Sequence, residues 1–145
     1  MNSSNPFAMM MNMMNQSIPS MGSAPSMGPM NLMNNGINPT PGATTFSLNK
    51  PGFYFVTFNG VGAATGATVG NIVIQLQRNG VNVPGAFTSA ASTTALTDVK
   101  SLSFSTIIQV KPSCCAVDNN VNLTFVNTGI PTTFSNINVA ITKLC

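Results

Sequence analysis

The chain has 145 residues, which is enough for one folded domain and a tail. Charged residues make up 5% of it, as five scattered Lys or Arg and two Asp, and there is no His. This composition argues against catalysis, because acid–base and nucleophilic mechanisms need paired titratable groups. It also argues against nucleic-acid binding, which needs clustered cations.

The side chains that usually form catalytic, metal or cofactor sites are also arranged unfavourably. Asp98 and Asp118 lie far apart in the sequence, and three Cys without a His lack the fourth ligand of a thiolate metal site. The glycines of 60–62 are followed by neither the further glycine nor the helix of a phosphate loop. We therefore predict a non-enzymatic protein with no catalytic residues, no metal and no cofactor.

The first 43 residues differ in composition from the rest. All ten Met lie within the first 33 residues, and the first charged side chain is Lys50. Prolines and glycines after Ser17 exclude a regular helix there, whereas Met9, Met10, Met13 and Met14 have a spacing that allows a shared helical face with Phe7. The sequence predicts an extended, uncharged N-terminal arm over 1–43 and a folded domain over 44–145.

Two roles are open for this arm: a disordered tail, or a segment that docks on a neighbouring subunit or scaffold. Methionine adapts to irregular apolar surfaces, and a mere spacer needs no such enrichment, so docking is favoured. The expected assembly anchors are Phe7, Met9, Met10, Met11, Met13 and Met14.

No secretion signal or membrane span is evident. The N-terminus carries no Lys or Arg, and the apolar stretch 8–14 is interrupted by Asn12 and too short to cross a bilayer. We expect a protein made in the cytoplasm that reaches the outer surface of a spore or of a virion released by lysis.

From residue 44 onward, alternating apolar residues predict β-strands separated by turn signals. In chain order the expected strands are 45–48, 53–59, 71–77, 81–83 ending at Pro84-Gly85, a weak or edge strand within 86–98, 101–111, 121–125 and 137–141, with a loop over 60–70. Asn79-Gly80 between alternating runs is a strong hairpin signal. The fold class is all-β, an antiparallel sandwich with no helix after residue 44.

The stretch 53–59, FYFVTFN, is apolar on both faces, which is typical of a central strand between two layers. A monomer with so few charges would also expose an apolar-rich surface, which favours a homotrimer. The residues expected in the core are Phe55, Ile74, Phe104, Ile108, Leu123 and Val139.

The cysteines are the remaining reactive side chains. Cys114 and Cys115 are adjacent in a strand-ending segment, and Cys145 is the last residue. Adjacent cysteines rarely bridge to each other, because the geometry is strained. Free thiols and bridges between Cys145 and Cys114 or Cys115, within or across subunits, are both open.

Several segments of the domain resemble a known family. They are KPGFYFVTFNG (50–60), IVIQLQRNGVNVPG (72–85), LSFSTIIQVKPSC (102–114), VNLTFVNTG (121–129) and INVAITKL (137–144). Together they are similar to the C-terminal domain of the collagen-like spore-surface, or exosporium, glycoproteins of bacilli and clostridia. Gly-X-Y triplets are missing, and the Met-rich arm stands in their place, so a collagen stalk is excluded.

The resemblance implies a jelly roll of the tumour-necrosis-factor and complement-globular-head type, with about 8–10 strands, that forms a homotrimer on an outer surface. Its expected partners are neighbouring trimers, or an underlying coat or capsid lattice, reached through the arm, with no nucleic acid and no membrane. The first functional hypothesis is a structural subunit of a spore-surface layer or appendage filament. The alternatives are a bacteriophage head fibre or capsid decoration protein, and a surface module that binds a ligand through loops 60–70 and 86–98.

Overall fold

The structure, a computed structural model, describes the chain in separate ranges. Backbone and side chains are described for 45–48, 50–65, 70–94, 97–112 and 121–144. For 7–12, 16–18, 23–24 and 33–35 the backbone alone is described.

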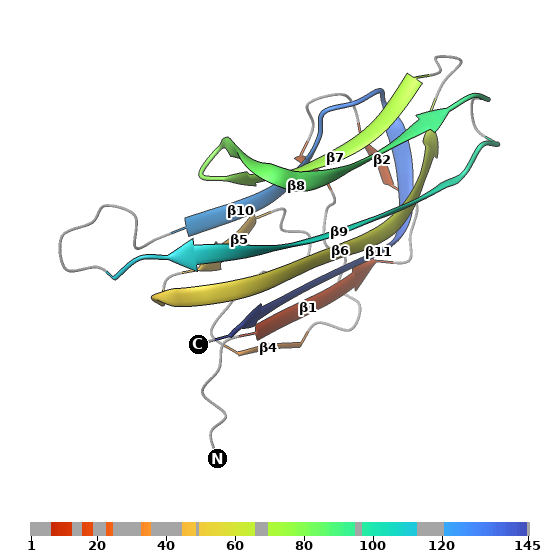
Figure 1. Cartoon of the computed structure of the whole chain (residues 1–145). Helices are drawn as coiled ribbons and strands as arrows, with labels where there is room; N and C mark the ends of the chain where they lie inside the picture. The colour runs from red at the N-terminus through yellow and green to blue at the C-terminus, as the bar shows by residue number, and fades with distance from the viewer. Residues whose placement is uncertain are drawn as a thin grey trace.

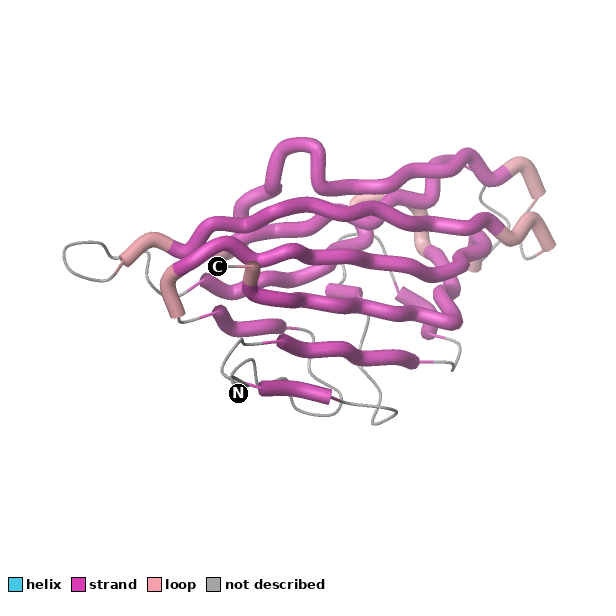
Figure 2. Tube along the Cα trace, turned by 60° about the horizontal axis from the view of Figure 1, so that its bottom comes forward, coloured by secondary structure: helices cyan, strands magenta, loops and turns pink. Residues whose placement is uncertain are grey.

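The described residues form two antiparallel β-sheets that pack face to face (Figure 1). One sheet has the order β4 (Met33–Asn35), β1 (Phe7–Asn12), β11 (Thr132–Lys143), β6 (Gly52–Ala64) and β9 (Lys100–Val110), with β2 (Gln16–Ile18) also on β11. The other has the order β3 (Ser23–Ala24), β10 (Val121–Asn127), β7 (Gly70–Arg78) and β8 (Val81–Ser92), with β5 (Thr45–Leu48) also on β10. This is an antiparallel jelly-roll sandwich, as expected, and Figure 2 shows only strands and loops among these residues.

The core lies between the two sheets and follows the alternation of the sequence. Inward positions of β6, β7, β10 and β11 are buried, in agreement with a period of two in the strand. Four aromatic rings meet at its centre, where Phe58 stacks on Phe104 at 5.7 Å and both contact Phe125. Phe46 adds an edge contact to Phe125. Of the expected core, Ile74, Ile108, Leu123 and Val139 are buried, and Phe104 is partly buried against them.

Phe55 was assigned to the core wrongly. Tyr54, Val56 and Phe58 point inward from β6, so Phe55 lies on the opposite side of the sheet and is 39% exposed. The strand is central within its sheet, between β11 and β9, but among the described residues no second layer covers its outer side. The prediction of a strand buried between two layers is therefore wrong, although the strand is interior within its own sheet.

Two expected breaks lie wholly or partly within strands. The predicted loop 60–70 is strand as far as Ala64, because Gly60 and Gly62 let β6 approach the side chains of Ile137 and Phe134 on β11. The predicted end at Pro84-Gly85 is instead an irregularity within β8, which continues to Ser92. The Asn79-Gly80 turn is confirmed, with both residues at positive φ.

The expected helical face over the start of the arm is wrong for 7–12, which form β1. Four short strands of the arm lie in the two sheets of the same chain, with β1 and β2 on β11, β3 on β10 and β4 on β1. That 1–43 is an assembly arm and 44–145 a separate folded domain stays a prediction.

Candidate functional site

We call the outer side of the sheet formed by β9, β6 and β11 the outer face. Its residues alternate with the buried ones, and cross-strand pairing places them in rows: Phe53, Phe55, Thr57 and Asn59 on β6, Ser103, Ser105, Ile107 and Gln109 on β9, and Asn138, Ala140 and Thr142 on β11. None of them is charged. A sheet face that is meant to remain in water usually carries charged side chains.

Of the large apolar side chains that are exposed in the described residues, Phe53, Phe55, Ile107 and Leu144 lie together at one end of the outer face, whereas Val81, Phe87 and Val99 lie elsewhere. Phe53, Phe55 and Ile107 are 42%, 39% and 56% exposed, and Phe55 is the direct cross-strand partner of Ile107. Leu144, also exposed, follows β11 and donates its backbone N–H to the carbonyl of Phe53 at 2.7 Å. Contiguous exposed apolar groups of this kind mark a protein–protein contact.

Next to this apolar cluster the outer face has a shallow depression. Its volume is about 260 Å³, and its lining comes from two neighbouring strands: Phe55, Thr57, Asn59, Ser103, Phe104 and Ser105. The polar groups available there are hydroxyls and one amide, without a titratable side chain. The depression therefore suits the packing of another neutral surface better than the binding of an ion.

The arm residues predicted as anchors lie only partly within the described chain. Phe7, Met9, Met10 and Met11 belong to β1, where backbone pairing is described, and Met13 and Met14 fall outside the described residues. The register sets Phe7 opposite Thr142, Met9 opposite Ala140 and Met11 opposite Asn138. The arm strand thus lies directly beside the outer face, on the far edge of β11 from β6.

The fold collects the cations that are scattered in the sequence. Lys50 precedes β6, Arg78 ends β7, Lys111 follows β9 and Lys143 ends β11, and the antiparallel register brings all four to the same end of the sandwich. There Arg78 donates from Nη1 to the carbonyl of Gln109 at 2.7 Å. A cavity of about 250 Å³ opens beside Arg78, between the β7–β8 turn and β9.

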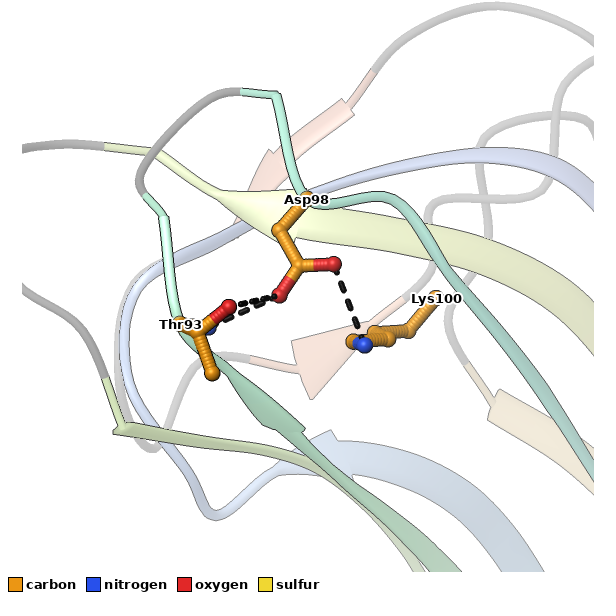
Figure 3. Close-up of polar contacts among 3 residues, drawn as sticks. All are labelled: Thr93, Asp98 and Lys100. Carbon is orange, nitrogen blue, oxygen red and sulfur yellow. Dashed lines mark hydrogen bonds and ion pairs between the residues drawn. The ribbon is translucent and has the colours of Figure 1, made fainter.

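The fifth cation, at the opposite end, is paired. Lys100 Nζ lies 3.1 Å from Asp98 Oδ1, and the backbone N–H and hydroxyl of Thr93 both donate to Asp98 Oδ2 (Figure 3). The Thr93 N–H, followed by Lys100, lowers the pKa of Asp98 below its usual value. This cluster ties the described ends of the loop between β8 and β9 together.

The three cysteines and Asp118 lie outside the described residues. Within the part of the chain that is described, no group of three or more His, Cys, Asp or Glu side chains comes close enough to hold a metal ion. The same part contains no helix with the length and hydropathy needed to span a membrane.

The structure superposes on several solved structures over nearly its whole length. Eiger TNF from S. frugiperda superposes with a TM-score of 0.63 at 13% identity, covering 98% of this chain and 94% of that one. Murine APRIL at pH 8.5 gives 0.62 at 9% identity over 97% and 99% of the two chains, and at pH 5.0 it gives 0.61 at 8% identity. The fold is a tumour-necrosis-factor-like jelly roll. At these identities the likeness concerns the fold alone.

Comparison of sequences gives no relative. No protein-family model and no curated protein sequence matches the chain. The expected jelly-roll fold is therefore confirmed, and the resemblance to spore-surface glycoproteins remains a prediction from the quoted segments.

Two features of the site were missed from the sequence. The first is the outer face itself, because FYFVTFN was interpreted as a strand buried on both sides. The absence of charge from Ser101 to Gln109 on the neighbouring strand was the available signal. The second is the grouping of cations, which depends on strand direction and cannot be seen in a linear chain.

Proposed function

We propose that the protein is a non-enzymatic structural subunit of a surface assembly, and that it forms a homotrimer through the outer face. The main observation that supports this proposal is the uncharged outer face with three exposed large apolar side chains, Phe53, Phe55 and Ile107. Removing such a surface from water contributes roughly 25 cal/mol per Å² of apolar area.

The shape of the surface supports repeated self-association. The outer face is built from three adjacent strands, and its Thr, Ser and Asn side chains lie next to the apolar cluster, which gives hydrogen-bonding groups to a closely packed interface. Symmetric assembly from one chain type uses such a surface in every copy. The tumour-necrosis-factor-like fold is compatible with a trimer.

For the setting of the assembly we propose the outer surface of a spore, as a layer or appendage filament whose subunits are joined by the arm. The support comes from the resemblance of the 50–60 and 72–85 segments to spore-surface glycoproteins. The Met-rich arm in place of collagen triplets favours a second candidate, a fibre or decoration protein of a bacteriophage head. Electron microscopy of the native source, or the identity of neighbouring genes, separates the two.

The trimer can be tested with two single variants, each of which adds one charge to a different face of the molecule. Ser105 lies on the outer face, on edge strand β9 opposite Thr57 of β6, and Ser89 lies on the outer side of β8 in the other sheet; both serines are exposed. Ser105→Lys buries a charge if the outer face is an interface, so light scattering on the full chain should show monomers.

Ser89→Lys is the matched control and should leave the mass at that of three chains. Circular dichroism confirms that both variants fold. Monomeric wild-type protein at micromolar concentration, or a trimer that tolerates Ser105→Lys, would overturn the proposed interface.

A further inference from the structure

We propose that on assembly the arm strand of one copy leaves its own sheet and pairs with β11 of a neighbouring copy, in the same register. This inference rests on the proposed function and names the surface on which the arm docks. The exchanged unit is the backbone stretch from Phe7 to Ile18, which contains β1 and β2.

The two arm strands lie end to end along one edge of β11. β1 pairs from Phe7 opposite Thr142 to Asn12 opposite Ile137, and β2 continues from Gln16 opposite Phe134 to Ile18 opposite Thr132. The gap between them coincides with the irregularity of β11 between Ser135 and Asn138. β1 and β2 therefore act as one interrupted strand that follows almost the whole length of β11.

β11 can remain in place when this strand leaves. Its opposite edge is paired with β6 from Thr132 to Lys143, and its inward side chains Ile137, Val139 and Ile141 are buried in the core. Removing the arm would thus leave a folded sandwich with an open, uncharged edge from Thr132 to Thr142. An open edge of that length is a template for another strand.

The segment that joins the arm strand to the domain determines when exchange occurs. Residues 19–44 separate β2 from β5, and they include β3, which pairs with β10, and β4, which pairs with β1, so exchange requires these two short pairings to open as well. Once they are open, this stretch spans at most about 85 Å at about 3.3 Å per residue. A covalent connection of that reach gives an effective concentration of about a millimolar for pairing within one chain. Because pairing within a chain and between chains makes the same hydrogen bonds, exchange is expected where neighbours are held in contact and not in dilute solution.

A pair of cysteines can report which chain supplies the strand. Leu144 donates to Phe53, so the even-numbered positions of this part of β11 form hydrogen bonds toward β6, and Met9 and Ala140 are a non-hydrogen-bonded pair across the other edge. Their Cα atoms should lie about 4.5 Å apart, which is within the range for a disulfide. All variants carry Cys114, Cys115 and Cys145 replaced by Ser.

The first measurement uses one chain with both Met9→Cys and Ala140→Cys, oxidised in dilute solution. An intramolecular disulfide is expected, and its absence would overturn the register and with it the proposal. The second measurement mixes a tagged Met9→Cys chain with an untagged Ala140→Cys chain. A disulfide between the two chains is expected in assembled material and not in dilute protein.

Ser89→Cys in place of Ala140→Cys is the matched control and should give no specific bridge to Met9→Cys. Assemblies of normal size without the mixed disulfide would show that the arm stays in its own sheet, which overturns the exchange and leaves the structural role intact. Failure of the unmodified chain to assemble at any concentration would instead overturn the proposed function.

Discussion

The side-chain amide of Gln75 on β7 donates a hydrogen bond to the carbonyl of Val83 on β8 at 3.0 Å, across the irregularity in the β7–β8 ladder. The same nitrogen lies 2.8 Å from the carbonyl of Leu76 and 3.2 Å from that of Ala86. Gln75 is only 9% exposed. One buried amide therefore satisfies carbonyls that the bulged residues of β8 take out of the ladder.

Gln75→Leu should destabilise the domain by about 1–3 kcal/mol, because it keeps the side-chain volume similar and leaves buried carbonyls without a donor. Urea unfolding measures the loss. Gln77→Leu is the control, since Gln77 makes an exposed hydrogen bond to Asn82, and it should change the unfolding free energy by about 0.5 kcal/mol or less. Equal effects of the two substitutions would contradict the role of Gln75.

Substitutions in the aromatic cluster should reduce stability by different amounts, according to how deeply each ring is buried. Phe125 is fully buried and contacts three rings, so Phe125→Ala should cost about 3–5 kcal/mol. Phe104 is only partly buried, and Phe104→Ala should cost less, because its site can admit water. Thermal unfolding of the two variants in parallel checks the order, and the reverse order would show the core to be centred elsewhere.

The contact between β6 and β11 can be tested with two substitutions, the second of which makes room for the first. A Cβ added at Gly60 would lie 2.7 Å from Ile137 Cδ1, so Gly60→Ala should cost about 1–3 kcal/mol. Ile137→Val removes that carbon and alone costs about 0.5–1.5 kcal/mol.

The double variant Gly60→Ala with Ile137→Val should lose less than the two single losses together, by at least about 0.5 kcal/mol. Denaturant unfolding of all three variants gives the coupling. Strict additivity would mean that the two side-chain positions do not meet.

Asp98 should titrate below the usual value of 3.8. Because the folded-state pKa is lowered, the contribution of Asp98 to stability is complete above the unfolded-state pKa and is lost as the pH falls through the folded-state pKa. Carbon NMR of the carboxyl group measures the pKa directly. Lys100→Gln should raise it more than Thr93→Ala, because the latter keeps the Thr93 backbone N–H; a pKa at or above 3.8 would contradict the cluster.

The cysteines stay a prediction, since they lie outside the described residues. Cys114, Cys115 and Cys145 should form cross-links in the native assembly, because no His is present to activate a thiol for catalysis. Non-reducing gels should show bands that reduction removes. Single-chain bands in both conditions, together with three titratable thiols, would show that the cysteines are free.

Where only one face of a strand is apolar, the sequence alone predicted which side chains are buried. Ile72, Ile74 and Leu76 alternate with more polar residues and are buried as expected, and Asn79-Gly80 forms the expected turn. Around Phe53 to Phe58 the alternation is lost, so nothing local decides which set of side chains faces the core, and Phe55 was placed wrongly. The packing of the second sheet determines which side chains of β6 are buried, and the sequence of β6 alone contains no information about that packing.

Breaks in the strands were misjudged for a related reason. Pro84-Gly85 and the glycines of 60–62 have weak strand propensity, yet both stretches continue as strand, because Gln75 and the side chains of β11 compensate for them. The pairing of 7–12 with β11 was not expected either. It connects residues at opposite ends of the chain, and the methionine pattern contains no information about that register.

The grouping of Lys50, Arg78, Lys111 and Lys143 at one end of the sandwich affects how assembly responds to salt. Any cyclic trimer places equivalent ends side by side, so these ammonium and guanidinium groups repel one another across subunits. Added salt screens this repulsion, and at 0.1 M charges more than about 10 Å apart are largely screened from each other. Association of the subunits should therefore become tighter as ionic strength rises, which is the opposite of an interface held together by ion pairs.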